Sequence, residues 1–360
     1  MGSGRTDSIK GEKMKRSSLI LKFMSVFFLI AALSACGKGC NKGGSPAGQI
    51  DPLTLIPANN NLLLSINWKK LIGTPFFQDA SKDMPSEAKE ISKDVNEAVI
   101  AVAMRGPSQA PSGLAIVSGN FDEPKIVGLI EEAAKKQGSG EVKKENIDGK
   151  TVHLSAKDPN IGMVFLSPHQ AAWGQIATLR ESLALLNNKG DSVKSNKELV
   201  DLFNKRDSNK LLWGAAILPP PPAGQTPAQA GDPMAALQGL KTFSLGIDYN
   251  NKDISIDWAG NTQEASQAQN IVNLVNSYKT IFGATLAAQQ PSLGQVIQGA
   301  QISNQDKTIH ISLKLNEEVL KQLSQKMADK NKESAPAPGA ASPALPVPAP
   351  TGQAAAPANQ

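Results

Sequence analysis

The chain is poor in the residues that most often carry chemistry. Its 360 residues include two cysteines and three histidines, and only 4% are aromatic. Both cysteines, Cys36 and Cys40, stand near the N-terminus, so no disulfide framework can cross-link the body of the chain. The scarcity of aromatic side chains leaves few surfaces on which sugars or nucleic-acid bases could stack.

Catalytic and nucleotide-binding motifs are also missing. The sequence contains no G-x-S-x-G, H-E-x-x-H, P-loop or G-x-G-x-x-G pattern. Ser86 and Lys89 have the S-x-x-K spacing of penicillin-recognising serine enzymes, but the companion S-D-N and K-T-G motifs are absent, so a polar helix face explains the pair better. Residues 248–253 are acidic without the Gly and final Glu of a calcium loop. We expect no enzyme, no metal site and no cofactor; a hydrolase with scattered residues is the least favoured alternative.

The net charge of +5 does not mark a nucleic-acid-binding protein. Residues 1–35 carry six basic and two acidic side chains, and therefore hold +4 of that charge. The remainder of the chain is close to neutral with both signs interspersed, whereas nucleic-acid binding needs a concentrated basic face.

The apolar run near the N-terminus is too short to be a permanent membrane span. It covers residues 23–33, interrupted only by Ser25, whereas a spanning helix needs about 20 residues. A basic segment precedes the run, and the small residues Ser34 and Ala35 and then Cys36 follow it. That order is typical of a secretory signal that is removed from the mature protein.

Residues 14–36, which end in Leu33-Ser34-Ala35-Cys36, resemble the lipobox segment of bacterial lipoprotein precursors. The resemblance implies that the thiol of Cys36 receives a diacylglyceryl group, that the chain is cut just before it, and that an acyl chain is added to the new amino group. Two or more acyl chains hold a protein stably on a membrane. Residue 37 is Gly rather than the Asp that resembles an inner-membrane retention mark in Gram-negative families, which favours the outer membrane.

The sequence leaves alternatives to lipidation open. Cleavage after Ser34 would give a simple secreted protein, and an uncleaved run would stay inserted in the membrane. Without acylation, Cys36 could pair with Cys40 in a disulfide in an oxidising compartment. With acylation, Cys40 has no partner. Met14 is an alternative start, because residues 1–13 add nothing that a signal needs.

Composition divides the chain into six parts. In order, these are a signal peptide (1–35), the lipidated Cys36 with a flexible Gly-rich tether (36–51), a first α+β unit (52–218), a Pro-rich linker (219–233), a second α+β unit (234–332) and an Ala- and Pro-rich tail (333–360). The tail cannot bury enough apolar surface to become ordered. We favour an inert tail over one that reaches toward a partner.

Hydrophobic periodicity and turn signals predict strands and helices in both units. Strands are expected at 61–68, 98–104, 113–118, 161–167, 171–175, 210–218, 242–249, 254–259, 298–303 and 308–314, with a further hairpin around Asp148-Gly149. Helices are expected at 78–94, after Asp122, and at 176–188, 196–205, 262–289 and 316–328. Helix 262–289 shows one apolar face, expected to lie in the core, made of Ala268, Ile271, Val272, Val275, Phe282 and Leu286.

Two short stretches of the first unit recur in the second. Residues 118–123 match 259–264, each at a strand-to-helix corner, and residues 150–155 match 307–312. We therefore predict an α+β fold of duplicated strand–strand–helix–strand–strand units, forming a mostly antiparallel sheet packed by helices. Unrelated strand orders in the two units would contradict the duplication.

The histidines and tryptophans are the remaining candidate site residues. His153 and His310 occupy matching places in the second pair of stretches, where they could form a pH-sensing or metal site, although solvent-facing strand residues are the favoured interpretation. His169 follows a proline in a turn and carries no signal. The four tryptophans fall in or beside strands and would line an apolar cavity or pack the core: Trp68, Trp173, Trp213 and Trp258.

These observations favour a non-catalytic lipoprotein on the periplasmic face of the bacterial outer membrane, which binds or scaffolds another envelope component. The start of the body at residues 55–77 resembles uncharacterised envelope lipoproteins, a likeness that brings no known activity. The alternative is a periplasmic carrier of a lipid or hydrophobic ligand, held between the sheet and helix 262–289. An enclosed apolar cavity of several hundred Å³ would favour the carrier.

Overall fold

The computed structural model describes residues 49–104, 111–136, 138–205, 207–219, 239–250, 252–319 and 322. The predicted signal peptide and tail, Cys36, Cys40, most of the predicted tether and nearly all of the Pro-rich linker lie outside these residues. By its internal contacts the chain divides into residues 1–316 and 317–360, and the description below concerns the first part. Among the described helices, none is both long and apolar enough to cross a membrane.

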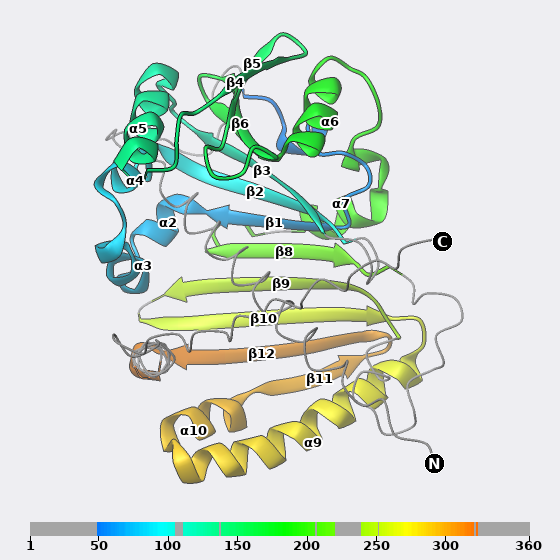
Figure 1. The fold of residues 1–360 in the computed structure, drawn as a ribbon. Coiled ribbons are helices and arrows are strands. Elements are labelled where there is room, and N and C mark those ends of the chain that lie inside the picture. Colours follow the sequence, from blue (N-terminus) through cyan, green and yellow to red (C-terminus); the bar gives the residue numbers. More distant parts are fainter. Residues whose placement is uncertain are drawn as a thin grey trace, which may run out of the picture. The chain divides into compact units, whose positions relative to one another are not determined.

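The architecture is built on one antiparallel sheet of twelve strands (Figure 1). From edge to edge the strand order is β11-β12-β10-β9-β8-β1-β2-β3-β7-β6-β5-β4. The strands are β1 (Leu62–Asn67), β2 (Val95–Ala103), β3 (Ser112–Gly119), β4 (Lys144–Ile147), β5 (Lys150–Leu154), β6 (Ile161–Ser167), β7 (Gln170–Gln175), β8 (Leu212–Ile217), β9 (Leu240–Asn250), β10 (Asp253–Thr262), β11 (Gln301–Gln305) and β12 (Thr308–Asn316). The predicted α+β class is confirmed, and the two predicted units share this sheet through the pairing of β8 with β9.

Short helices connect the strands, and several begin at a side-chain cap. The helices are α2 (Trp68–Ile72), α3 (Pro75–Ala80), α4 (Ser86–Ile91), α5 (Glu123–Lys136), α6 (Ile176–Leu186), α7 (Lys197–Asn204), α9 (Ala265–Gln289) and α10 (Pro291–Gly299), with 3-10 turns η1 (Pro52–Thr54), η2 (Ser81–Asp83) and η3 (Val193–Ser195). Asn67, Thr74 and Asn196 each accept a hydrogen bond from a first-turn backbone N–H.

Two helix predictions need correction. The single helix expected at 78–94 is divided into α3, η2 and α4 because Pro85 cannot continue a helix. The long helix expected at 262–289 begins one turn later than predicted, because Glu264 itself is the cap and Gln267 its capping-box partner, so α9 begins at Ala265. The sequence interpretation also missed α10, which Pro291 starts directly after α9.

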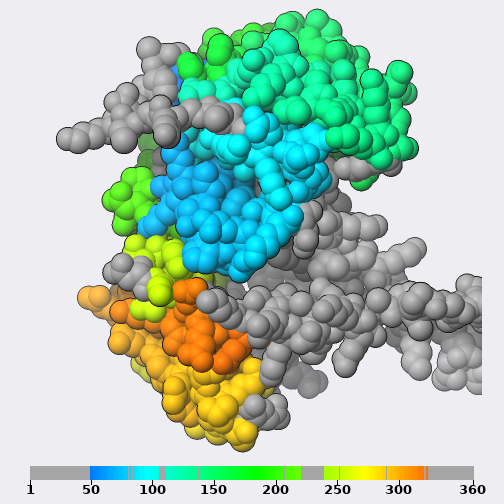
Figure 2. Space-filling view, turned by 90° about the vertical axis from the view of Figure 1, so that its left-hand side faces the viewer, coloured from blue at the N-terminus to red at the C-terminus, as the bar shows by residue number. Residues whose placement is uncertain are grey.

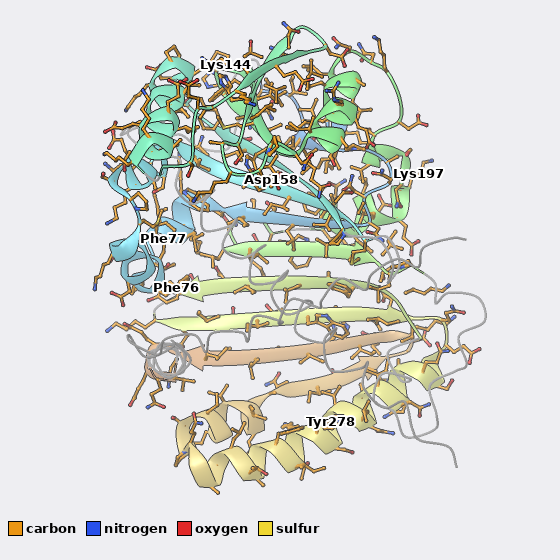
Figure 3. The ribbon with its side chains drawn as sticks, viewed as in Figure 1. Phe76, Phe77, Lys144, Asp158, Lys197 and Tyr278 are labelled. Atoms are coloured by element: carbon orange, nitrogen blue, oxygen red, sulfur yellow. The ribbon has the colours of Figure 1, made fainter. Side chains whose placement is uncertain are left out.

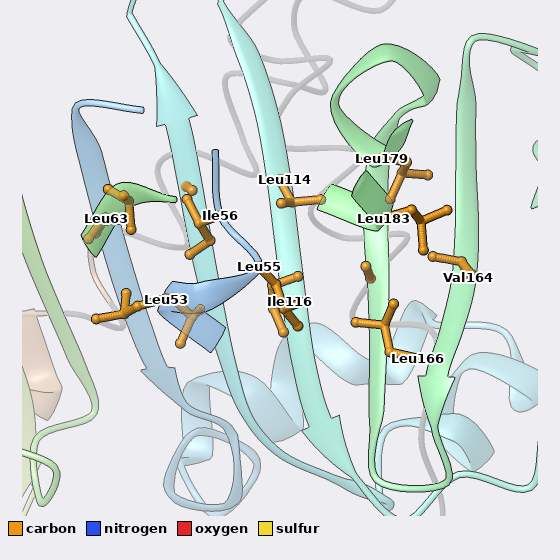
Figure 4. Packing of buried hydrophobic residues seen from close by; sticks show 14 of the residues in the cluster. Leu53, Leu55, Ile56, Leu63, Leu114, Ile116, Val164, Leu166, Leu179 and Leu183 are labelled. Carbon is orange, nitrogen blue, oxygen red and sulfur yellow. The ribbon is translucent and has the colours of Figure 1, made fainter. Parts of the chain in front are cut away.

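In the first half of the sheet (β1 to β8), the strands β2, β3, β6 and β7 are largely buried on both faces. We call face A the side toward which Leu63 and Ile116 point, and face B the opposite side, toward which Ile66 and Phe165 point. Face A packs against η1, η3, α6 and α7 in the largest cluster of buried apolar residues (Figure 4). Face B packs against α2, α4 and α5. Near-continuous apolar runs such as residues 161–167 follow from burial on both sides.

In the second half of the sheet (β9 to β12), apolar and polar side chains alternate more strictly along each strand. On β9, β10 and β12 the apolar side chains point to face B, where Trp258 and Ile309 pack against the N-terminal half of α9. The residues between them in each strand are small or polar and point to face A. One face of this half-sheet is therefore apolar and joins the core where α9 covers it, and the other face is polar.

The strand orders agree with a duplication. The sheet extends to either side of the central pair β1 and β8 through two sets of four strands, in the order β2-β3-β7-β6 on one side and β9-β10-β12-β11 on the other. In each set a helix on face B follows the second strand. The first set has one extra hairpin, β4–β5, added at its edge. A two-fold axis normal to the sheet between β1 and β8 would relate the two sets.

Only one of the two recurring stretches falls at equivalent places. Residues 118–123 and 259–264 both form the corner between the second strand and the helix. The stretches 150–155 and 307–312 do not correspond. The second stretch lies in β12, which pairs with β10, the second strand of its set. The first lies in β5, which belongs to the extra hairpin and pairs with β6, the outermost strand of its set. In this respect the sequence match was misleading.

Candidate binding surface

The structure does not bring the two strand histidines together. His153 of β5 points to face B, and His310 of β12 points to face A at the far side of the sheet. His310 is exposed as predicted, but His153 is 6% exposed because α5 covers it. Its Nε2 lies 3.3 Å from Oε1 of Glu123, the first residue of α5. Its Nδ1 is buried without a hydrogen-bond partner among the described residues.

Ser86 and Lys89 do not form a nucleophile–base pair. The Ser86 hydroxyl donates to Glu87 at 3.0 Å, and Lys89 Nζ donates to the backbone carbonyl of Lys82 at 3.0 Å. Glu87 also accepts from Lys136 of α5, and the hydrogen bond from this ammonium is the main cause that lowers the pKa of the Glu87 carboxyl to about 2. The polar helix face thus joins α4 to α5.

Asp248 and Asp253 belong to the β9–β10 hairpin rather than to an ion-binding loop: Asp248 lies near the end of β9, and Asp253 starts β10. Asp248 pairs with Lys70 and accepts from the backbone N–H of Tyr249. The turn takes Lys252 through a positive φ of 73°. Within the described ranges, no three His, Cys, Asp or Glu side chains come close enough together to hold a metal ion.

An apolar cavity lies between face B and the helices α4 and α5. Trp68 and Trp173 line it, but its volume is about 40 Å³, close to the space of one water molecule at about 30 Å³. Trp258 packs under α9 and Trp213 is on face A, so the four tryptophans do not share a cavity. This cavity is too small for a lipid.

The place where a carried ligand was expected is filled by side chains. Between the sheet and α9, Ala268, Ile271 and Ile309 are each at most 1% exposed. Close packing of this kind gives no room for an apolar ligand. The carrier alternative therefore lacks support at the contact between the sheet and the long helix.

A larger recess, of about 290 Å³, lies on face A of the second half. Its floor consists of two cross-strand rows, Ser244-Ala259-His310-Ser303 and Gly246-Asp257-Ser312-Gln301. Most members of both rows are small, so the floor stays low, while the larger Trp213 stands at one end. We call this recess the face-A recess; it is lined by Trp213, Ser244, Asp257, Ala259, Gln301, Ser303, His310 and Ser312, together with Trp258 and Ile311.

The face-A recess is polar but carries little net charge. Lys210 Nζ lies 2.7 Å from Asp257 Oδ2 and 5.9 Å from the centre of the Trp213 ring. The Nε1 of Trp213 is buried without a hydrogen-bond partner among the described residues. An unpaired buried N–H costs free energy, about 1–3 kcal/mol. The recess therefore offers hydrogen-bonding groups and an aromatic edge rather than a charged or reactive centre.

Sequence reasoning missed most residues of the recess. Of them, His310 and the tryptophans Trp213 and Trp258 had been singled out. A signal was present, because the side chains of residues 242–246, 255–261 and 308–314 alternate between apolar and small or polar. That alternation predicts a strand with one polar face, but it does not predict which polar faces adjoin.

The surface of α9 differs from expectation at its C-terminal half. Phe282, predicted to lie in the core, is 53% exposed, and its neighbour Ile281 is 61% exposed. The prediction was wrong because this half of α9 leaves the sheet and packs against α10 instead, through Gly283 and Ala287. α9 lies at the molecular surface in Figure 2 (yellow), and Tyr278, which stacks on Phe282, is labelled on it in Figure 3.

Comparison with known proteins finds a likeness in fold alone. No protein-family profile matches the chain, and no curated protein matches it. Among solved structures, it is similar to crystal form III of TP0453, at 12% identity and a TM-score of 0.45 over 76% of this chain and 96% of that one. Crystal forms I and IV of TP0453 give 12% and 11% identity, each with a TM-score of 0.43, over 78% of this chain and 98% and 99% of theirs. Likeness at this level carries no conclusion about function.

Proposed function

We propose that this protein is a non-catalytic lipoprotein of the bacterial cell envelope that binds another envelope component in the face-A recess. The recess carries the proposal: it is a polar hollow on face A of the sheet, with the Trp213 side chain at one end. A polar protein segment that enters it would hydrogen-bond with Ser244, Ser312 and Gln301. No cofactor is needed for such binding.

The anchor of this proposed function is the acyl group on Cys36. The order of basic segment, apolar run, small residues and cysteine supports it, as does the Gly-rich stretch that follows. With Gly37 after the cysteine, we assign the protein to the periplasmic face of the outer membrane. The chain would then be attached to the membrane by lipid rather than by a spanning helix.

Metabolic labelling tests the anchor. Cells that express the protein are grown with radiolabelled palmitate, and the immunoprecipitated chain is compared with Cys36→Ser and Cys40→Ser variants. We expect label on the native chain and on Cys40→Ser, no label on Cys36→Ser, and co-migration of the native chain with outer-membrane vesicles on a density gradient. Label that persists in Cys36→Ser would contradict the anchor.

Position-specific crosslinking tests the recess. A photoactivatable amino acid replaces His310 on the recess floor in one strain and the exposed Ala177 of α6 in a control strain. We expect a discrete crosslinked species from position 310 alone. We further expect Ser244→Trp to suppress it, because the indole would fill the floor. Equal crosslinking from both positions, or no effect of the filled recess, would refute the binding site.

A further inference from the structure

The hairpin of α9 and α10 is almost free of charge. Between Glu264 and Asp306 the only charged residue is Lys279. At the average of 19% charged residues for the chain, this stretch of 41 residues would hold about eight. A surface helix in water normally carries charges on its outer face, so an aqueous surrounding does not explain the composition.

The single charge is also turned inward. Lys279 Nζ donates to the backbone carbonyl of Ala300 at 2.6 Å, and the residue is only partly exposed. It therefore bridges the end of α10 back to α9. The outer surface of the hairpin is left to amide, hydroxyl and apolar side chains.

Large apolar side chains of α9 are exposed within this uncharged stretch. Ile281 and Phe282 are the exposed large hydrophobic residues of the described chain. The rings of Tyr278 and Phe282 stack with their centres 5.7 Å apart. We call this area the α9–α10 surface: the side of α9 in the hairpin that carries Tyr278, Ile281 and Phe282.

We propose that the α9–α10 surface contacts the headgroup–acyl boundary of a lipid bilayer. The headgroup–acyl boundary of a bilayer favours aromatic side chains, and a surface without charged side chains enters it without the cost of desolvating a charge. A protein partner would not require that absence, because the rims of protein interfaces are polar and tolerate charges.

A second copy of the chain fits the surface less well. A stable dimer buries about 1,200–2,000 Å² in total, whereas Ile281 and Phe282 form a small apolar centre. Insertion of two side chains would give a weak membrane contact instead. Its occupancy rises when a second attachment, such as the proposed acyl group on Cys36, holds the protein near the bilayer.

Vesicle flotation tests the contact without any acyl chain. The complete mature chain from residue 36, with Cys36→Ser and Cys40→Ser, is mixed with vesicles of phosphatidylethanolamine and phosphatidylglycerol. Phe282→Asp is compared with Ala177→Asp, which adds the same charge to an exposed position of α6. We expect Phe282→Asp to weaken binding about tenfold or more, since partial burial of one large apolar side chain contributes about 1.4 kcal/mol. Ala177→Asp should bind as the parent does.

A fluorescent reporter gives the second measurement. An environment-sensitive dye is attached to Phe282→Cys or to Ala177→Cys in the same background. We expect a blue shift on vesicle addition and quenching by brominated acyl chains at position 282 only. Absence of vesicle binding by the parent, or equal responses at both positions, would overturn the proposal. Thermal melts of all variants identify any that fail to fold. The acyl anchor is tested separately by palmitate labelling, so failure of either proposal is distinguishable.

Discussion

A single added methyl group should separate the two helices of the α9–α10 hairpin. Gly294 of α10 lies so close to α9 that a Cβ built on it would meet Ala287 Cα and N at 2.5 Å and Ala287 Cβ at 2.7 Å. These atoms belong to a helix backbone and its first side-chain carbon, so no rotamer change can relieve the contact. Gly294→Ala therefore has to push the helices apart.

The magnitude follows from a comparison within the same helix. A Cβ on Gly299 would meet nothing within 4 Å, so Gly299→Ala should be neutral or stabilising by about 0.4–1 kcal/mol. Gly294→Ala lowers the conformational entropy of the unfolded chain by a similar amount, but its overpacking destabilises the folded state by about 1–3 kcal/mol. We therefore expect the free energies of unfolding of the two variants to differ by about 1–3 kcal/mol.

Urea unfolding of both variants measures this difference, and hydrogen exchange locates it. Amide protection should fall in α10 and the C-terminal half of α9 for Gly294→Ala, and stay unchanged for Gly299→Ala. Equal stability of the two variants, or a loss of protection confined to the first-half sheet, would refute the close approach of the helices.

Three further predictions concern the first half. Phe203→Ala should lower the free energy of unfolding, measured by urea denaturation, by about 3–5 kcal/mol, because Phe203 is fully buried. As a control, Leu202→Ala at the half-buried neighbouring position should lower it by less than half of that amount. Lys136→Met should raise the pKa of Glu87 from about 2 toward its ordinary 4.5 in a carboxyl NMR titration, because it removes the largest cause that lowers this pKa. Because the folded pKa is the lower one, the stabilisation is present above pH 4.5 and declines as the pH falls to about 2, and it should be smaller in the variant. His153→Leu should leave urea stability unchanged or raise it by about 1 kcal/mol, since it removes an unpaired buried nitrogen; a large loss would show that the imidazole is needed.

Local structure was predictable where it depends on neighbouring residues. The Asp148-Gly149 hairpin is present with both residues at positive φ, as Asp-Gly turns require. The helices predicted at 176–188 and 196–205 correspond to α6 and α7. Errors arose where one residue overrides a periodic pattern, as Pro85 and Pro291 do.

The site could be predicted only in part. Strand alternation placed His310 on one strand face with Thr308 and Ser312, but the face-A recess needs four strands in register with small residues aligned across them. The exposure of Phe282 was unpredictable from helical spacing, because spacing gives the side of the helix and not the element that covers it.

The sequence by itself determined the α+β class, the hairpins and the corner shared by the two units, since each depends on contiguous residues; the acyl anchor at Cys36 stays a prediction. Tertiary structure decided the rest: the continuation of both units in one sheet, the burial of His153 under α5, the low floor of the face-A recess and the departure of α9 from the sheet toward α10. These features depend on which distant segments pair and cover one another. Such pairing is fixed by packing of the whole chain, so no local pattern encodes it.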